Sequence, residues 1–189
     1  TRSDWVFYFL SKNNSPVIYE CHQFTKIRKI IINKSLKSKN SKVIFLNENL
    51  RDDYITKYPL DNNYLVLHNG VDLDLFKESK QNIYETIFVG NLKRFNESRN
   101  IRFLLSAFKE VDKKYTLKII GAKESEATEL KNEINSLGIA NRVKVLGYLD
   151  HRETINEMVK SGIGILINSD SNIHSTKYTS PLKYFEYIA

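Results

Sequence analysis

The feature that most constrains the fold is a regular alternation of apolar runs and amphipathic segments that begins near residue 85. Runs rich in β-branched residues predict four buried strands: ETIFVG (85–90), YTLKIIG (115–121), RVKVLGYL (142–149) and GIGILINS (162–169). Between them, apolar residues recur at helical spacing in three segments: 101–111, 124–138 and 151–162. Strands that alternate with helices of this length form right-handed βαβ units, so we predict an α/β domain whose parallel sheet is covered on both faces.

A second, less regular α/β pattern precedes this one. It predicts strands at 16–22, 42–47 and 64–69, with helices at 23–37 and 48–58. The segment DWVFYFL (4–10) has strand-forming residue types, but its place directly before a strand favours the helix of a βαβ crossover, which we predict. The polar, turn-rich segment 69–82 marks a boundary, and we therefore expect one domain at 1–79 and a second at 80–189.

Composition limits the classes of function. The 189 residues are 41% hydrophobic, as in a soluble globular protein, and no apolar run is long enough to span a membrane. An excess of 29 Lys and Arg over 22 Asp and Glu favours an anionic partner without choosing among nucleotide, nucleic acid and membrane surface. The single cysteine, Cys21, excludes an internal disulfide framework, and the absence of an aromatic-basic readout motif argues against a nucleic-acid module.

Two corners of the predicted second sheet carry candidate binding residues. Ligands of open parallel sheets bind outside the carboxyl ends of the strands. After the strand at 85–90, Gly90 would let a phosphate approach the backbone, Asn100 could cap the next helix, and Arg99 could form a charge-assisted fork to phosphate oxygens. A turn glycine beside a solvated arginine is the simpler alternative.

The second corner is SPLKYFEYIA (180–189). Ser180 and Pro181 are typical of a helix start, and Lys183 adds a positive charge in the first turn. Glu186 follows three residues later on the same face, where its carboxylate could accept hydrogen bonds from the hydroxyls of a ribose. The alternative is an ordinary surface ion pair between Lys183 and Glu186.

Taken together, these stretches resemble the family-4 retaining glycosyltransferases of the GT-B fold. The resemblance rests on the order and spacing of HNGVDLDLF, IFVGNLKRFNESRNIRFLLSAF, LKIIG, NRVKVLGYL and SPLKYFEYIA. It implies two Rossmann-like domains, both incomplete in this chain, and an enzyme of about twice the length. It also implies a nucleotide-diphosphate sugar as donor, a hydroxyl group of a glycan or lipid-linked acceptor, and no metal or other cofactor.

Carried over position by position, the resemblance assigns roles to individual residues. Glu186 matches the glutamate that holds the donor ribose, Gly90 lies beside the diphosphate, and Arg99 takes the place of a phosphate-binding lysine. His22 matches the histidine that the N-terminal domain presents to the donor sugar, so we expect His22 and Arg99 to be catalytic. The other expected donor-binding residues are Asn91, Lys93, Arg94, Leu146, Gly147, Tyr148, Tyr178, Thr179, Ser180, Pro181, Leu182 and Lys183.

The sequence departs from the family pattern at two of these positions. Tyr178 stands where a second glutamate is frequent, which puts contacts to the transferred sugar in doubt. Asn91 stands where an arginine is common, and Lys93 or Arg94 could compensate for it.

Three other signals leave alternatives open. Asp72 and Asp74 resemble a metal-binding Asp-x-Asp pair, although their place in a linker leads us to expect no metal. Glu20 and His22 lie on one face of a predicted strand, so Glu20 either orients the imidazole or is an unlinked neighbour. The run 26–42 predicts a basic amphipathic helix, for which packing on the core is favoured over binding to a membrane surface.

The function expected from the sequence is therefore a cytoplasmic, bacterial-type glycosyltransferase of glycan, capsule or lipopolysaccharide synthesis, with peripheral contact to an anionic membrane as an option. Two other functions stay open: a nucleotide-sugar epimerase of GT-B-like fold, and a non-catalytic basic module that binds polyanions or membranes.

Overall fold

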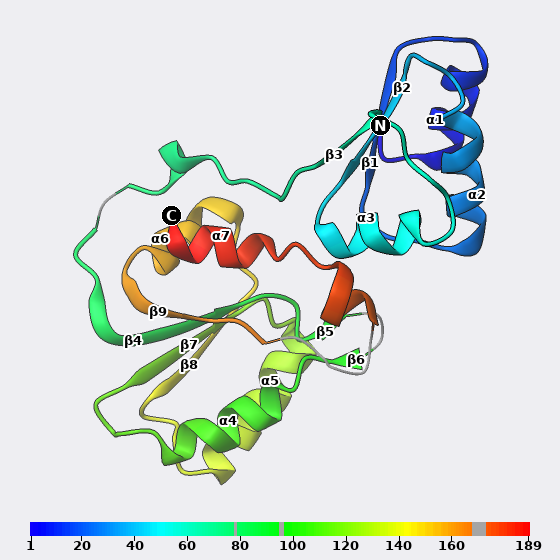
Figure 1. Ribbon diagram of the computed structural model, residues 1–189. Coiled ribbons are helices and arrows are strands. Elements are labelled where there is room, and N and C mark those ends of the chain that lie inside the picture. The colour runs from blue at the N-terminus through cyan, green and yellow to red at the C-terminus, as the bar shows by residue number, and fades with distance from the viewer. Residues whose placement is uncertain (78, 95–96, 168–172) are drawn as a thin grey trace. The chain divides into compact units, whose positions relative to one another are not determined.

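The computed structural model describes residues 1–77, 79–94, 97–167 and 173–189. The chain divides into two compact α/β units (Figure 1). The first unit comprises Thr1–Asn69 and Asp170–Pro181, and the second comprises Gly70–Ser169 and Leu182–Ala189. The chain thus leaves the first unit after Asn69, upstream of the division expected after residue 79, and later returns to it, which the sequence pattern did not indicate.

The first unit is built on three parallel strands in the order β1-β2-β3. Its elements are α1 (Asp4–Lys12), β1 (Val17–Cys21), α2 (Lys26–Ser35), β2 (Ser41–Phe45), α3 (Glu48–Ile55), β3 (Tyr64–Val66) and the π-helical turn η2 (His174–Tyr178). The predicted helix at 4–10 is confirmed. Ser3, Thr25 and Asn47 cap the three α-helices by accepting hydrogen bonds from backbone N–H groups in the first turn.

One hydrophobic core holds the first unit together. Helices α1 and α2 lie side by side, and Phe7 of α1 stacks on Tyr19 of β1 with 5.1 Å between the ring centroids. Along β1, Val17, Tyr19 and Cys21 are buried, whereas the alternating residues are more exposed. Other buried members of this core are Ile32, Val43, Phe45, Leu46, Leu50 and Tyr54.

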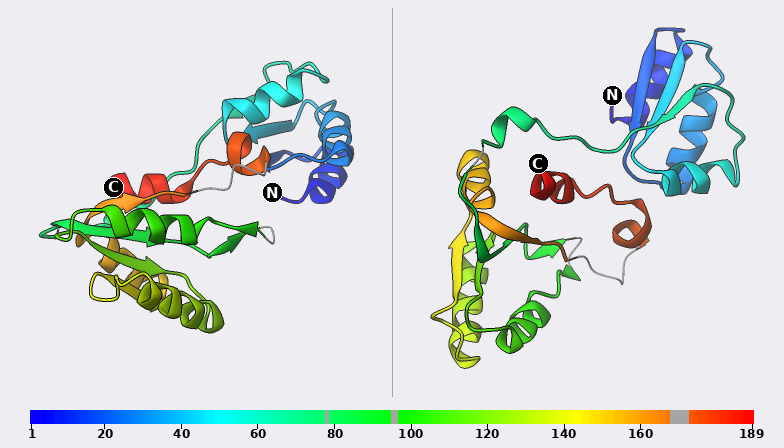
Figure 2. Two further views of the ribbon diagram at one scale, coloured as in Figure 1. Left: turned by 90° about the horizontal axis from the view of Figure 1, so that it is seen from below. Right: turned by 60° about the vertical axis from the view of Figure 1, so that its left-hand side comes forward.

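The second unit is built on four parallel strands in the order β8-β7-β4-β9. Its elements are η1 (Leu73–Leu75), β4 (Asn82–Val89), β5 (Lys93–Arg94), β6 (Glu97–Ser98), α4 (Ile101–Glu110), β7 (Thr116–Ile120), α5 (Glu124–Ser136), β8 (Val143–Gly147), α6 (His151–Met158), β9 (Ser161–Ile165) and α7 (Leu182–Ile188). Strands β5 and β6 form a short antiparallel hairpin that the sequence did not predict. Figure 2 shows this sheet and its helices from two further sides.

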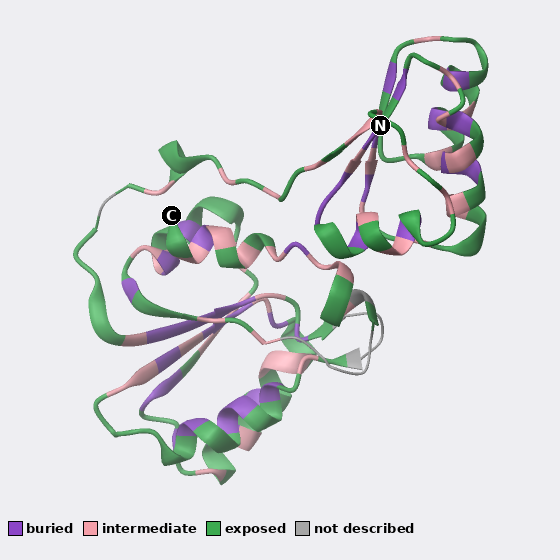
Figure 3. Cartoon of the chain, in the orientation of Figure 1, coloured by how far each residue is buried: buried purple, intermediate pink, exposed green. Residues whose placement is uncertain are grey.

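Helices cover both faces of the second sheet, as predicted. Helices α4 and α5 pack on Phe88, Leu117 and Ile119. On the opposite face, α6 and Tyr187 of α7 pack on Ile87, Val89 and Ile120. Figure 3 shows the resulting run of buried residues through the central strands.

Candidate functional site

The carboxyl edge of the second sheet consists of glycine backbone. Strands β4 and β7 end directly before Gly90 and Gly121, and β8 ends at Gly147. The N–H of Gly90 donates to the carbonyl of Ile120 at 3.0 Å, and the N–H of Gly121 donates to the carbonyl of Gly147 at 2.7 Å. The three glycines therefore lie in a row, and the N–H groups of Gly90 and Gly121 are engaged within the sheet.

Close packing at this edge requires two of the glycines. Gly121 has a φ of +105°, and a Cβ atom there would lie 2.5 Å from the carbonyl oxygen of Gly90. A Cβ atom on Gly90 would collide with Nη1 of Arg99. The first role of Gly90 is thus to make room for a guanidinium group, rather than to leave open space for a phosphate.

The β5–β6 hairpin brings Arg99 to this position. Lys93 pairs with Ser98 across the hairpin, and the backbone N–H of Arg99 donates to the carbonyl of Leu92 at 2.8 Å. The chain thereby turns back toward the end of β4, and the expected corner of Gly90 and Arg99 is formed. The prediction that Asn100 caps α4 is wrong: Asn100 has left-handed backbone, with a φ of +56°, and its side chain makes no capping hydrogen bond.

Tyr187 of α7 ties a distant segment to the same strand end. Its hydroxyl accepts a hydrogen bond from the N–H of Val89 at 3.0 Å, and its ring occupies the space that a side chain at Gly164 would need. Burial raises the pKa of Tyr187 to about 12, while the positive charge of nearby Arg99 acts in the opposite direction. Sequence reasoning missed this residue, although a glycine inside a strand, such as Gly164, is a known signal of close approach.

Sequence reasoning also assigned no role to Gly121. The signal that could have identified it is the repeated strand ending, because FVG, IIG and VLG each place a glycine after a run of β-branched or apolar residues. Three such endings in adjacent strands predict one continuous glycine edge.

The ion pair between Lys183 and Glu186 is formed, but it is not an ordinary surface pair. Glu186 is only 5% exposed, and its carboxylate accepts a hydrogen bond from the ammonium group of Lys183. A buried carboxylate needs such compensation, because burial without a partner would favour its neutral form. Glu186 directly precedes Tyr187, and both residues belong to the short helix α7.

The start of α7 differs from the prediction. The helix begins at Leu182, and Pro181 precedes it rather than occupying its first position. The hydroxyl of Ser180 accepts a hydrogen bond from the N–H of Asn69 at 3.1 Å, and the Asn69 side chain donates to the carbonyl of Ser180 at 2.7 Å. Ser180 thus joins two segments of the first unit.

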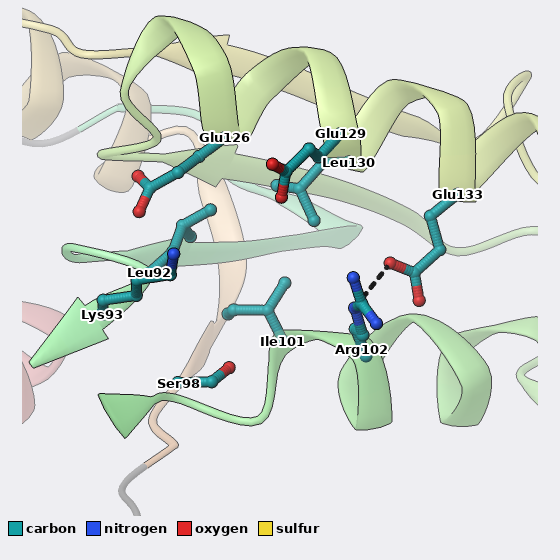
Figure 4. A pocket seen from close by; sticks show the side chains of 9 residues that line it. All are labelled: Leu92, Lys93, Ser98, Ile101, Arg102, Glu126, Glu129, Leu130 and Glu133. Atoms are coloured by element: carbon teal, nitrogen blue, oxygen red, sulfur yellow. Dashed lines mark ion pairs between the residues drawn. The ribbon is translucent and has the colours of Figure 1, made fainter. Parts of the chain in front are cut away.

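Lys93 lines a hollow of about 290 Å³ between α4 and α5. Figure 4 shows the carboxylates of α5 on one side of this hollow and Lys93, Ser98 and Arg102 on the other. Arg102 pairs with Glu133 at 3.3 Å. The hollow is lined by Leu92, Lys93, Ser98, Ile101, Arg102, Glu126, Glu129, Leu130 and Glu133.

The remaining expected donor residues of the second unit differ in exposure. Tyr148 directly follows the glycine edge and is 80% exposed, so its ring is available to a ligand. Leu146 packs with the core formed by α6, and Asn91 is exposed. Arg94 lies in β5, and its side chain is outside the part that the structure describes.

In the first unit, His22 follows the last residue of β1 and its side chain is 34% exposed. Its Nε2 lies 2.7 Å from Oε1 of Glu20, and Arg2 reaches the same carboxylate at 3.3 Å. Burial acts to raise the pKa of Glu20, but the hydrogen bonds from His22 and Arg2 outweigh it and hold the pKa below its usual value. Of the two alternatives, Glu20 therefore contacts the imidazole and can orient it.

Tyr178 and Thr179 belong to the segment that returns to the first unit. The hydroxyl of Tyr178 hydrogen-bonds to Asp53, and burial together with this contact raises its pKa. Asn49 of α3 donates to the carbonyl of Lys177 at 3.0 Å, which fixes η2 to the first unit. Tyr178 packs on the core of that unit, and Thr179 is half-buried.

Among the described residues, no group of three or more His, Cys, Asp or Glu side chains is arranged to hold a metal ion. The carboxylate of Asp72 instead accepts a hydrogen bond from the N–H of Asp74 at 3.1 Å and caps η1. In the same part of the chain, no helix combines the length and the apolar character needed to cross a membrane.

Comparison with known proteins gives a family match and a fold match. Residues 74–170 match the family described as glycosyl transferases group 1. Among curated protein sequences, no match was found.

Solved structures with the same fold have low sequence identity. Sucrose-phosphate synthase from Thermosynechococcus elongatus is 15% identical and superposes with a TM-score of 0.61 over 85% of this chain and 47% of its own. HepE from Anabaena, in complex with UDP, is 17% identical, with a TM-score of 0.60 over 83% and 49%. A glycosyltransferase from Rickettsia africae is 13% identical, with a TM-score of 0.54 over 83% and 52%. The chain thus has the fold of GT-B glycosyltransferases and spans about half the length of these proteins.

Proposed function

Because the chain belongs to the glycosyl transferases group 1 family, we propose that it contributes the donor site of a retaining enzyme that transfers a sugar from a nucleotide diphosphate to a hydroxyl acceptor. The acceptor is a glycan or a lipid-linked glycan, and the reaction takes place in the cytoplasm. The observation that carries the proposal is the placement of the Arg99 guanidinium on Gly90, at the end of β4 and beside the other two edge glycines.

This arrangement suits a diphosphate because a guanidinium group offers paired donors with a fixed charge, and the strand ends beside it carry no Cβ atoms. Tyr187 fastens α7 to the same strand end, so that Lys183 and Glu186 are held in a defined place relative to Arg99. HepE binds UDP and UDP-glucose, which makes UDP the first nucleotide to test on this chain.

The proposed reaction breaks the bond between the anomeric carbon and the diphosphate oxygen, and forms a bond from that carbon to the acceptor oxygen. The proton of the acceptor hydroxyl passes to the departing diphosphate. As charge develops on this leaving group, Arg99 stabilises it more strongly in the transition state than in the ground state. His22, oriented by Glu20, contacts the donor sugar, and Glu186 holds the ribose hydroxyls.

Transfer with retained configuration at the anomeric carbon is expected from the family resemblance. The proposal needs no metal ion, because Arg99 supplies a fixed positive charge at the diphosphate.

A thermal-unfolding panel with UDP, GDP, ADP and inorganic phosphate tests the proposal. A nucleoside diphosphate present at a hundred times its dissociation constant adds about 2.7 kcal/mol of stability, because it binds only the folded chain. Inorganic phosphate at the same concentration should add much less. Equal stabilisation by inorganic phosphate and by all nucleotides would indicate a non-specific anion site and would contradict the proposal.

A further inference from the structure

The net charge of the chain is concentrated in one segment. Residues 1–45 contain nine Lys and Arg against two Asp and Glu, and so account for all of the net charge of +7. The remaining residues carry 20 charges of each sign. The basic segment forms α1, β1, α2 and β2 of the first unit. Of its cations, Arg2 serves the proposed function through its contact with Glu20.

The two helices of this segment also expose large apolar side chains. Trp5 and Phe9 of α1 are 56% and 58% exposed, and Ile27 of α2 is 66% exposed. Trp5, Tyr8 and Phe9 form one aromatic group, with ring centroids 5.6 to 6.5 Å apart. Val6, Leu10 and Ile30 are further exposed apolar residues of the same helices. Such a cluster on a water-facing surface indicates an interaction site.

A lysine-rich hollow lies between the ends of α1 and α2. It has a volume of about 500 Å³ and is lined by Tyr8, Ser11, Lys12, Asn14, Lys34, Ser35, Lys37 and Ser38. Among these described residues none is acidic. The two helix C-termini contribute about half a negative elementary charge each, which offsets only about one of the three ammonium charges. The hollow is therefore electropositive and rich in hydroxyl and ammonium donors.

Helical spacing joins the apolar side chains to this hollow. On α1, Trp5, Phe9 and Lys12 follow one another at intervals of four and three residues. On α2, Ile27, Ile30 and Lys34 follow at intervals of three and four. Helices α1 and α2 lie side by side (Figure 1), and Lys12 and Lys34 line the same hollow, so the exposed apolar residues of both helices lead to one lysine-rich end. We call these apolar residues and the hollow the α1–α2 face.

We propose that the α1–α2 face docks on a membrane surface that contains anionic phospholipids. Trp5 and Phe9 enter the interface between head groups and acyl chains, where amphipathic aromatic rings are favoured. Lys12, Lys34 and Lys37 bind phosphate groups of the lipids at the hollow. A polyanion in solution would use the lysines alone, whereas the aromatic group beside them favours a surface with an apolar interior.

The fluorescence of Trp5 gives a direct test, because Trp5 is the only tryptophan in the chain. Vesicles with about one third phosphatidylglycerol in phosphatidylcholine should shift its emission to shorter wavelength, and lipids brominated on the acyl chains should quench it. Pure phosphatidylcholine vesicles and heparin should do neither. No shift with the anionic vesicles, or an equal shift with heparin, would overturn the proposal. A shift that depends on protein concentration and needs no vesicles would also overturn it, because a second copy would then cover the face.

Two variants that lose the same charge distinguish binding by the lysines of the hollow from non-specific electrostatic attraction to the vesicle. The triple variant Lys12→Gln/Lys34→Gln/Lys37→Gln should weaken vesicle binding about a hundredfold, since each lysine near an anionic surface contributes about a factor of five. The control Lys109→Gln/Lys113→Gln/Lys131→Gln removes the same charge from exposed positions of the second unit and should change binding less than about threefold. Equal losses in the two variants would overturn the assignment to the hollow.

The aromatic part of the face has its own test. Phe9→Ser should weaken binding and reduce quenching by brominated lipids, while far-UV circular dichroism stays unchanged because the side chain is exposed. Unchanged binding and quenching would contradict insertion. None of these measurements uses a nucleotide, so their outcome is independent of the proposed glycosyl transfer.

Discussion

The two units of the chain share parallel α/β topology but differ at the carboxyl edges of their sheets. In the second unit, three strands end at or directly before glycines, and the guanidinium of Arg99 lies against Gly90. In the first unit, β1 is followed by the partly exposed His22, whereas Leu46 and Asn47 after β2 are buried. The edge of the second unit therefore differs from that of the first in lacking Cβ atoms at three strand ends, whereas the first presents an imidazole.

The units differ in charge as well. The first unit carries a net charge of +5, from 12 Lys and Arg against 7 Asp and Glu, whereas the second carries +2, from 17 against 15. The proposed binding of a diphosphate at the glycine edge therefore rests on the local placement of Arg99 more than on an overall field. The excess charge of the first unit is available to a different anionic partner.

The largest expected effect concerns the glycine edge of the second unit. Gly121→Ala should lower the free energy of unfolding by about 4 kcal/mol, because the new Cβ would meet the Gly90 carbonyl and the backbone has a positive φ. Gly138→Ala is the matched control: its φ is also positive, at +70°, but no atom lies within 4 Å of the added Cβ. The control should cost about 1 kcal/mol in urea unfolding. Equal costs would show that the close approach of Gly121 and Gly90 is unimportant.

The reactivity of Cys21 shows whether the destabilisation caused by Gly121→Ala stays within the second unit. It is the only cysteine, it is fully buried in the first unit, and burial raises the pKa of its thiol to about 12. The thiol should therefore react slowly with an alkylating reagent at pH 8 until the first unit opens. Gly121→Ala should leave this rate unchanged within about twofold. A large acceleration would contradict separate stability of the two units.

The next effect concerns the attachment of α7. Tyr187→Phe removes the hydroxyl that accepts from the buried N–H of Val89, and should cost about 1–3 kcal/mol of stability because that donor is left without its acceptor. Tyr184→Phe, at a half-exposed position of the same helix, should be nearly neutral. Denaturant unfolding of both variants gives the comparison. Similar values for the two would mean that α7 is not held through Tyr187.

The smallest expected effect lies in the first unit. The pKa of Glu20 is lowered in the folded chain, so the carboxylate stabilises the fold above its ordinary pKa and loses this contribution as the pH falls through the lowered value. Glu20→Gln should cost about 0.2–1 kcal/mol at pH 6, since the pair is partly exposed and screened. The difference from the unsubstituted chain should shrink below pH 4. A difference that grows on acidification would contradict the stated sign.

The sequence predicted the elements better than their long-range connections. Periodicity was sufficient for the strands of the two parallel sheets, though not for the β5–β6 hairpin, and the order of elements was sufficient to predict the helix at 4–10. The sequence also placed Gly90 and Arg99 together at the carboxyl end of one strand, because Gly90 ends that strand and Arg99 precedes the next helix. The sequence pattern could not predict the hydrogen bond between Tyr187 and Val89, which lie 98 positions apart. It also could not predict the hydrogen bond between Asn69 and Ser180, which lie 111 positions apart. Side chains at such separations are brought together by tertiary packing, which no local pattern encodes.

The return of 173–181 to the first unit escaped prediction for the same reason. The contacts that hold it run from Asn49 to Lys177 and from Asp53 to Tyr178. Asn100 failed as a helix cap because its residue type fits the position while its left-handed backbone does not.

The central claim is that Arg99 at the glycine edge binds the diphosphate of a nucleotide. Calorimetric titration of UDP into the unsubstituted chain, Arg99→Ala and Arg102→Ala tests it most directly. Arg102 is an exposed arginine on the next helix that pairs with Glu133, so its removal changes the charge equally without touching the edge. The account predicts a loss of about 1.5–3 kcal/mol in binding free energy for Arg99→Ala, as for a charge-assisted contact, and almost none for Arg102→Ala. Unchanged UDP affinity in a folded Arg99→Ala variant, or equal losses in both variants, would contradict it.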